Sequence, residues 1–547
     1  MQDGSPLAAL TQAMKARGFE YAGLQADNWL SFQGRVSAVG AEHPAQVAVD
    51  PRGLELPRVR VMLPAGAPEV LAHIGANGSV CYAAKGSVVL DVFDIAGQTL
   101  ACIERAAQVL DLSLRGQMKQ DLEDEFFAFW HGDLCLLDVE PGNVSALTVL
   151  FASRDGAGGS VAFVSSDPAR TRLKLKALRL VEKEVFPGVA FKVRTVAKPR
   201  PLQGEWPPAT VAALLQWQGL LDPAARRNIE RHLLTACTAD TPGALCVVES
   251  PLMQYAFLVL FEPSSKRRQI GRTPDTRVRL YASKVHSLIT IRLDDNYMSQ
   301  RNTPGRPTLA SKRIALVGCG TIGGFLAELL VKGGAGQNGG ELLLIDPDIL
   351  LPQNVGRHRL GLNYALLNKA TGLKLDIAAG TPAANVRDLP TRAEEADLSR
   401  VDLVINTTGE EALGHCLTRR ATDAGYFVPT LSVWVEGPGV AVRGLLRDAP
   451  GAACTRCTSD AARRPLFPVI HGEMPIELAG HGCESLYVPF PATVSVQAAC
   501  LAAEMVADWA AGAPTPRLRT RITRAEFVQA APDADISRLE ACPACGT

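Results

Sequence analysis

A glycine-rich turn between an apolar strand and a helix is the feature that most constrains the fold of this chain. The turn reads Gly318-Cys319-Gly320-Thr321-Ile322-Gly323, after an apolar run over residues 313–317 and at the start of a helical stretch over residues 323–332. Glycines permit a tight turn and let a phosphate group approach the backbone, while the helix N-terminus offers N–H donors and a positive dipole. The turn therefore predicts a nucleotide site built on Gly318, Gly320 and Gly323.

Further strand-like runs predict the architecture around this turn. They cover residues 341–345, 401–406 and 428–435. Such a pattern predicts a Rossmann-like α/β unit with a largely parallel sheet and helices on both faces, which we place at residues 301–547. Asp346 ends the strand after the turn, where an acidic side chain can bind the hydroxyl groups of a ribose. Taken alone, these features favour an NAD-type Rossmann oxidoreductase.

The residues after this acidic position carry charges that a dehydrogenase does not need. Asp346-Pro347-Asp348 is followed by Asn354, Arg357 and Lys369. This order resembles the ThiF/HesA/MoeB superfamily, the adenylating domain of ubiquitin-activating enzymes. The resemblance implies that ATP is bound through Asp346, Asp348 and Asn354 and that Arg357 and Lys369 act as catalytic cations. Cations spread over a triphosphate stabilise the charge that develops as pyrophosphate leaves.

One segment departs from the pattern of this superfamily. Its members usually carry an aspartate near bound magnesium after a later strand, and here Gly409 occupies that position. Glu410 follows directly, and we expect its carboxylate to serve the Mg²⁺ ion. The glycine also keeps open the alternative of a catalytically inactive scaffold.

Two Cys-x-x-Cys pairs, far apart in the sequence, predict a metal clip. They are Cys454 with Cys457 and Cys542 with Cys545. Four thiolates can surround Zn²⁺ tetrahedrally and leave no open coordination position, so we expect this zinc to be structural rather than catalytic. The same paired cysteines occur in the resembled superfamily, and a redox dithiol is the alternative.

A single cysteine, Cys483, lies between the two pairs and precedes a helical stretch over residues 494–509. A thiolate near a helix N-terminus and away from zinc can be activated as a nucleophile. In the resembled superfamily a cysteine of this crossover loop captures the acyl group as a thioester. The resemblance thus implies the same catalytic role for Cys483.

The N-terminal part of the chain contains a second candidate nucleophile, Cys81, with His73 and Asn77 upstream of it. A strand meander precedes this cysteine and helices follow it, which resembles the ubiquitin-conjugating fold and its divergent bacterial members and implies a catalytic role for Cys81. A strict His-Pro-Asn motif is missing, the role of Asn77 at a thioester stays open, and a buried structural Cys81 is the alternative. The expected elements are helices at residues 6–17, 96–110 and 120–130 and strands at residues 29–36, 46–49 and 58–63.

The whole chain of 547 residues divides into three expected domains. An α+β ubiquitin-conjugating-like domain at residues 1–142 and the adenylating domain flank an α/β connector domain at residues 143–300, which shows no chemical motif. In the connector, helices are expected at residues 209–221 and 223–236, the second capped by Asp222. Its strands are expected at residues 145–153, 160–165, 255–261, 277–281 and 287–293.

The composition argues against several kinds of partner. Lys plus Arg and Asp plus Glu both number 56, so no field of one sign favours nucleic acid or an anionic membrane. No apolar run approaches the roughly 20 residues that span a bilayer, and the first residues lack the pattern of a signal peptide. The cysteines therefore favour reduced thiols, and we expect a cytoplasmic protein.

The order of the domains is similar to that of bacterial activating–conjugating fusion proteins, some of which serve CBASS anti-phage operons. The resemblance implies that ATP and Mg²⁺ activate the C-terminus of a small ubiquitin-like protein, that Cys483 takes the acyl group, and that Cys81 receives it before the amine of a target protein attacks. It also implies a homodimer in which Arg301 or Arg306 reaches the nucleotide of the other subunit, with a surface role for these arginines as the alternative. A sulfur-carrier-protein adenylyltransferase of cofactor synthesis is the alternative, besides the oxidoreductase.

Overall fold

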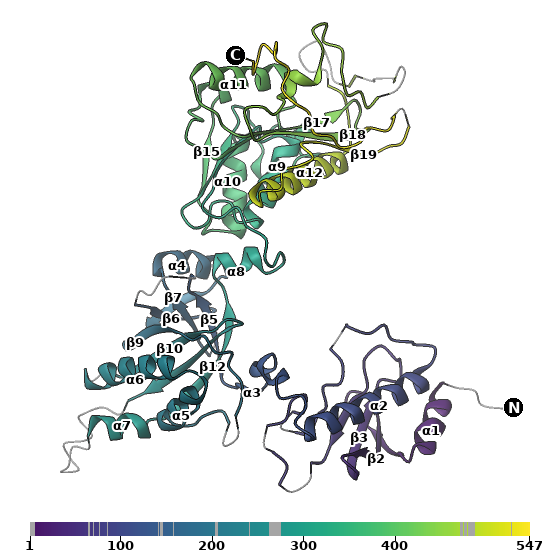
Figure 1. Ribbon diagram of the computed structural model, residues 1–547, viewed down its shortest axis with the longest axis vertical. Coiled ribbons are helices and arrows are strands. Elements are labelled where there is room, and N and C mark those ends of the chain that lie inside the picture. The colour runs from purple at the N-terminus through teal and green to yellow at the C-terminus, as the bar shows by residue number, and fades with distance from the viewer. Residues whose placement is uncertain are drawn as a thin grey trace, which may run out of the picture.

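The computed structural model describes residues 6–63, 66–68, 70–75, 77–84, 86–140, 142, 146–156, 158–202, 206–239, 241–261, 275–470, 474, 478–479, 487–526 and 528–546. Cys483 lies outside these residues. The chain forms an N-terminal, a middle and a C-terminal unit, each with its own sheet (Figure 1). Among the described residues, no helix combines the length and the apolar character needed to cross a membrane.

The N-terminal unit is an antiparallel meander with the strand order β1-β2-β3-β4, on which α1 and α2 pack. Asp94 caps α2 by accepting the N–H of Gly97, and the buried residues of this helix recur every three or four positions, so one apolar face meets the core. The α+β arrangement confirms the expected fold. The elements are α1 (Pro6–Ala16), β1 (Glu20–Leu24), β2 (Leu30–Ala38), β3 (Ala41–Val49), β4 (Arg58–Val61), α2 (Ile95–Leu114) and the 3-10 turn η1 (Asp121–Glu123).

The middle unit is built on a mixed sheet with the strand order β8-β6-β7-β5-β12-β11-β10-β9. Helix α4 packs on β6, β7 and β8, and α6 packs on β9 and β10 with α5 and α7 beside it. The elements are α3 (Phe126–Phe129), β5 (Asp133–Asp138), β6 (Thr148–Ser153), β7 (Val161–Ser165), α4 (Pro168–Ala177), β8 (Val181–Val185), β9 (Val189–Arg194), α5 (Val211–Leu221), α6 (Pro223–Thr238), β10 (Gly243–Glu249), β11 (Gln254–Leu260), α7 (Thr276–Ala282) and β12 (Val285–Arg292).

The structure confirms one expected helix start in the middle unit and corrects two other expectations. Asp222 caps α6 by accepting the N–H groups of Ala224 and Ala225. Residues 277–281, expected as a strand, form helix α7, because Asp275 accepts a backbone N–H at its start. The expected helix at residues 120–130 is instead the separate short turns η1 and α3.

Two features place the start of the middle unit before the expected boundary at residue 142. Strand β5 pairs in parallel with β7 and β12 of the middle sheet. Phe126 and Trp130 are fully buried in a cluster with Trp217 and Tyr255 of the same unit. We therefore propose that the middle unit begins near residue 124.

The C-terminal unit contains a sheet with the strand order β15-β14-β13-β16-β17-β18-β19. The first five strands are parallel, and β18 and β19 continue the sheet in antiparallel pairing. Helices α9, α10 and α12 pack on one face and α11 on the other, as expected (Figure 1). The elements are α8 (Asp295–Gln300), β13 (Arg313–Val317), α9 (Thr321–Lys332), β14 (Glu341–Ile345), η3 (Pro352–Asn354), η4 (Leu362–Tyr364), α10 (Lys369–Gly380), β15 (Val386–Leu389), η5 (Ala393–Glu395), β16 (Leu403–Asn406), α11 (Glu411–Asp423), β17 (Thr430–Glu436), β18 (Ala441–Arg447), η6 (Thr455–Thr458), α12 (Ala492–Ala510) and β19 (Leu518–Ile522).

Candidate nucleotide site, conjugation site and cysteine cluster

The glycine-rich turn connects β13 to α9 at the carboxyl end of the parallel strands. Gly318 has a left-handed backbone with a φ of 88°, and its N–H donates to the Ile345 carbonyl of β14 at 2.9 Å. A Cβ on Gly323 would lie 1.9 Å from the Gly318 carbonyl oxygen, so the helix can approach the strand only with glycine at this position. A Cβ on Gly320 would meet nothing within 4 Å, so the backbone there faces open space.

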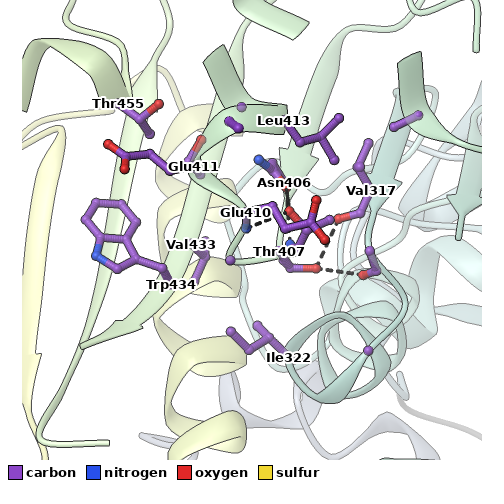
Figure 2. Close-up of a pocket in the computed structure, with 18 of the residues that line it drawn as sticks. Val317, Ile322, Asn406, Thr407, Glu410, Glu411, Leu413, Val433, Trp434 and Thr455 are labelled. Carbon is purple, nitrogen blue, oxygen red and sulfur yellow. Dashed lines mark hydrogen bonds between the residues drawn. The ribbon is translucent and has the colours of Figure 1, made fainter. Parts of the chain in front are cut away.

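A cavity of about 1010 Å³ opens beside this turn. It lies where β13 has β14 on one side and β16 on the other, which is the point in an α/β sheet where ligands bind. The Thr407 hydroxyl donates to the Gly318 carbonyl at 2.7 Å and thereby ties the turn to the end of β16 (Figure 2). Figure 2 also shows Trp434 and Glu411 on another side of the cavity, away from the turn.

Asp346 fixes the backbone of the turn. It is buried, and its two carboxylate oxygens accept the N–H groups of Cys319 and Asp348 at 2.7 and 2.8 Å. Burial raises the pKa of this carboxyl group, although the two backbone donors and the charge of Lys369 oppose the shift. Lys369 Nζ lies 2.8 Å from a carboxylate oxygen of Asp348. These three predicted residues therefore meet at one end of the cavity.

Two further predicted residues are not part of the cavity wall in the described structure. Asn354 accepts the N–H of Leu351 at 3.0 Å, within the turn η3. The Arg357 guanidinium lies over the rings of Tyr487 and Phe490, at 4.9 and 5.2 Å from their centroids. Phe490 lines the cavity, so Arg357 lies next to its wall. Roles for Asn354 and Arg357 at a nucleotide stay predictions.

Glu410 lines the cavity at the start of α11, one residue after Gly409. Its N–H donates to the Thr408 hydroxyl at 3.1 Å, and that hydroxyl donates to the Asn406 side-chain oxygen at 2.8 Å. Sequence reasoning singles out Gly409 and Glu410 of this segment but not Asn406 and Thr408, although polar residues directly after an apolar strand are a usual signal for a site. Trp434, which also lines the cavity from β17, carries no sequence signal.

His358 supports the glycine-rich turn as a buried neutral ring. Its Nε2 lies 2.8 Å from the Cys319 carbonyl oxygen, and its Nδ1 accepts the N–H of Leu360 at 3.0 Å. Because Nδ1 is an acceptor, the hydrogen sits on Nε2. Burial lowers the pKa of His358; the Cys319 carbonyl and the charge of Asp346 oppose this shift, and the charge of Lys369 adds to it.

We therefore expect acidification to destabilise this turn. The unfolded chain protonates His358 near its ordinary pKa of 6.5. The folded ring resists protonation to lower pH, so the stabilisation present above pH 6.5 is lost as the pH falls toward the folded pKa. Hydrogen exchange of residues 313–332 above and below this pH measures the effect. His358→Gln keeps an N–H donor but does not titrate, and it should flatten the profile; an unchanged profile contradicts the assignment.

The four buried cysteines of the two Cys-x-x-Cys pairs converge on one point. Cys454 Sγ lies 3.9 Å from Cys457 Sγ and 3.7 Å from Cys542 Sγ, and Cys457 Sγ lies 3.6 Å from Cys545 Sγ. A tetrahedron with metal–sulfur bonds of about 2.3 Å has sulfur–sulfur edges of about 3.8 Å, so this spacing suits Zn²⁺. Disulfide bonds would need sulfurs about 2.05 Å apart. The geometry therefore favours a metal clip over a redox dithiol.

Cys81 lies in the loop between β4 and α2, and it is exposed rather than buried in the core. His73 and Glu125 lie beside it, with one side-chain atom of each of the three residues within 4.8 Å of the others. Burial and the negative charge of Glu125 raise the pKa of the Cys81 thiol. Asn77 accepts the N–H of Ser79 at 3.0 Å within its own turn, so it serves the loop locally.

Comparison with known proteins extends these observations. Residues 294–543 match the ThiF family, and residues 7–133 match the Prokaryotic E2 family B. The chain is 44% identical over 555 aligned residues to the ATP-dependent ubiquitin transferase-like protein Cap2 of Pseudomonas aeruginosa (strain BWHPSA011 / Pa011), and the alignment covers 100% of both chains. The chain belongs to the family of Cap2 ATP-dependent ubiquitin transferase-like proteins.

Other known proteins match this chain at lower identity. Cap2 of Escherichia coli (strain TW11681) is 26% identical over 465 residues, which is 78% of each chain. Among solved structures, the crystal structure of E. coli MccB matches with a TM-score of 0.34 and 16% identity, covering 43% of this chain and 65% of MccB. Membership of the Cap2 family confirms the expected pairing of a ThiF domain with a ubiquitin-conjugating-like domain in one ATP-dependent enzyme. It favours neither a sulfur-carrier adenylyltransferase nor an oxidoreductase.

Proposed function

We propose that this enzyme adenylates the C-terminal carboxylate of a small ubiquitin-like protein, carries the acyl group as a thioester and transfers it to an amine of a target protein. The observation that carries the proposal is the cavity beside the glycine-rich turn, which brings the open backbone at Gly320 together with Asp348, Lys369 and Glu410. A triphosphate needs backbone N–H donors, a cation and carboxylates that hold a divalent metal ion, and this cavity offers all three.

The predicted residues in and beside the cavity have separate roles in this scheme. Lys369 binds the phosphates of ATP, and Asp346 keeps the turn closed and accepts from the ribose with its remaining lone pairs. Asp348 and Glu410 would hold Mg²⁺, which neutralises charge on the phosphates. The carboxylate of the ubiquitin-like protein attacks the α-phosphate of ATP, and pyrophosphate leaves. Arg357 and Asn354 support the site from the neighbouring turn.

Two cysteines then carry the acyl group. Cys483 attacks the acyl-adenylate and releases AMP, and Cys81 takes the acyl group from Cys483 by trans-thioesterification before the target amine attacks. The exposure of Cys81 supports its role as an acceptor, because a thiol that receives a protein-sized acyl group must be accessible. Each transfer exchanges one acyl bond for another, so a difficult reaction is divided into easier steps.

We also propose a role for the bound metal, an oligomeric state and a cellular location for the enzyme. Zn²⁺ in the Cys454–Cys545 cluster has a structural role, since four thiolates fill its coordination sphere. The enzyme works in the cytoplasm as a homodimer through the C-terminal unit, in which Arg301 or Arg306 reaches the nucleotide of the other subunit. An anti-phage or stress pathway supplies the ubiquitin-like protein and the target.

Non-reducing gels test the relay with the full chain, ATP, magnesium and the ubiquitin-like protein encoded beside it. We expect wild type to carry thioesters on both cysteines, Cys81→Ala to carry one on Cys483, and Cys483→Ala to carry none. Cys102→Ala, a half-buried thiol of the N-terminal unit, is the matched control and should behave as wild type. Charging of Cys81 in the Cys483→Ala variant would contradict the two-step order. ATP–pyrophosphate exchange measures adenylation separately.

A further inference from the structure

A histidine and a carboxylate adjoin the Cys81 thiol, and the relay described above does not use them. One side-chain atom each of Cys81, His73 and Glu125 lies within 4.8 Å of the others. The side chains of His73 and Glu125 are 22% and 18% exposed. Both groups are therefore shielded from most of the solvent but still accessible to a molecule that reacts at the thiol.

His73 holds the Glu125 carboxylate in place. Its backbone N–H donates to Glu125 Oε2 at 2.7 Å, and its Nδ1 lies 2.6 Å from Oε1. On the other side of the ring, Nε2 lies 3.0 Å from Asp121 Oδ2. The His73 carbonyl accepts the Cys81 N–H at 2.7 Å, so the same residue fixes both the thiol loop and the carboxylate.

The backbone of His73 is strained. Its φ is 63°, in the left-handed region that residues with a side chain rarely adopt. Such a conformation is found preferentially at functional sites, where the surrounding contacts enforce it. The hydrogen bonds of the His73 backbone with Glu125 and Cys81 enforce its conformation in this way. We take this as an indication that the placement of the thiol and the carboxylate serves a function beyond local packing.

Glu125 reaches the thiol from a segment that is anchored in the middle unit. The next residue, Phe126, is fully buried there, with its ring centroid 5.1 Å from that of Trp130 and 5.2 Å from that of Tyr255. Trp130 Nε1 donates to the Ala256 carbonyl of the middle sheet at 3.2 Å. Figure 1 shows α3 between the two units. The middle unit thus positions a carboxylate beside a thiol of the N-terminal unit.

We propose that Glu125 is a catalytic residue of the conjugation step, in which it accepts the proton of the target amine that attacks the Cys81 thioester. The inference rests on the proposed function of Cys81. The amine nitrogen bonds to the acyl carbon, the bond between that carbon and Cys81 Sγ breaks, and its electron pair leaves on sulfur. Glu125 takes the first proton, which the ammonium form of the amine must lose before it can attack, and later returns it to the solvent. The second proton, which the nitrogen loses as the amide forms, goes to the sulfur, which yields an amide and the free thiol of Cys81.

Distance and charge both suit this role. An amine that attacks the acyl carbon lies next to Sγ, so a carboxylate within 4.8 Å of the sulfur is within hydrogen-bond reach of the nitrogen. A carboxylate has about four lone-pair sites, so the two contacts with His73 leave others free. Because the pKa of the Cys81 thiol is raised, the departing thiolate readily takes the proton.

The test separates attack by the amine from formation of the thioester. Full-length wild type and Glu125→Gln are charged with the ubiquitin-like protein, ATP is removed, and decay of the Cys81 thioester is followed with excess free lysine or with hydroxylamine. Glutamine keeps the size of the side chain but does not accept the proton. We expect Glu125→Gln to form the thioester and to react with lysine about 100-fold more slowly. Its reaction with hydroxylamine, which is unprotonated at neutral pH, should stay close to that of wild type.

Glu123→Gln is the matched control. Glu123 lies in the same segment but pairs with Arg200 at 3.1 Å and with Lys198 at 3.4 Å, so this variant should react as wild type does. Three outcomes for Glu125→Gln would overturn the inference: a normal rate with lysine, an equal loss with both nucleophiles, or failure to form the thioester. A wild-type chain that never carries the acyl group on Cys81 would instead overturn the proposed function, and the inference with it.

Discussion

Replacement of Gly323 by alanine is expected to abolish ATP–pyrophosphate exchange and to destabilise the C-terminal unit by about 3 kcal/mol. The added Cβ would lie 1.9 Å from the Gly318 carbonyl oxygen and 2.8 Å from the Thr407 hydroxyl. The first of these atoms belongs to the backbone of the turn and does not rotate away, so α9 must move off the sheet and carry its N-terminus out of the cavity. Exchange assays and hydrogen exchange of residues 313–345 measure the two effects.

Gly320→Ala is the matched variant that separates nucleotide binding from folding. Its Cβ would meet nothing within 4 Å, so stability should change by less than about 1 kcal/mol, far less than in Gly323→Ala. The methyl group would stand where a phosphate approaches the backbone, and a displacement of about 1 Å at a reacting group costs about 100-fold in rate. Normal exchange by Gly320→Ala, or normal folding and exchange by Gly323→Ala, would contradict this account of the turn.

The same turn explains why the C-terminal unit is the most predictable part of the fold. The expected bounds of β13 and β14 are those observed, because short apolar runs flank a turn that requires glycine at positions 318 and 323. Strands β10 and β18 were not predicted. Nearly every residue in them is buried, so their side chains show no alternation of apolar and polar character that sequence reasoning could detect.

Elsewhere, a local cap or a contact between distant segments decides the structure. In α7 the β-branched and aromatic residues Val278 and Tyr281 favour a strand locally, but the Asp275 cap starts a helix. The boundary expected at residue 142 would place the aromatic residues Phe126 and Trp130 in the N-terminal domain, whereas both rings pack in the core of the middle unit. Which core an apolar segment joins is tertiary information that its own composition does not contain.

The candidate sites also differ in how well the sequence predicts them. Asp346, Asp348 and Lys369 could be predicted because their linear order reflects one βαβ unit, and the structure brings them together. Glu125 could not be predicted, because it meets Cys81 only after the two units that carry them have folded and joined. Sequence spacing therefore identifies sites made by one supersecondary motif, and it does not identify sites assembled from two units.

The second large effect is expected from the cysteine cluster. We expect one Zn²⁺ per chain by elemental analysis, and we expect Cys457→Ser or a strong chelator to lower the unfolding midpoint of the C-terminal unit by about 10 °C. Zinc bound by four thiolates contributes about 10–16 kcal/mol in small zinc-dependent folds. The unfolding midpoint of a unit of 150–250 residues shifts by about 2–4 °C for each kcal/mol of stability. A loss of about 3 kcal/mol, a small part of the zinc contribution, therefore lowers the midpoint by about 10 °C.

The contacts around the cluster extend the effect to adenylation. The segment after β19 runs beside the loop after β18, where the Ala453 N–H donates to Ile536 at 3.2 Å and the Arg538 N–H donates to Gly451 at 3.0 Å. Turn η6, which contains Cys457, also presents Thr455 to the cavity. Loss of the metal therefore frees one wall of the cavity, and ATP–pyrophosphate exchange should fall together with stability.

Cys500→Ser provides the control for the cysteine cluster. Cys500 is an exposed thiol of α12 outside the cluster, so its loss should leave the zinc content, the unfolding midpoint and the exchange rate unchanged. A metal-free wild type whose four cysteines titrate as two disulfides would contradict the zinc clip and favour a redox dithiol. Wild-type stability of Cys457→Ser would show that the packing of η6 against α11, and not the metal, holds this wall of the cavity.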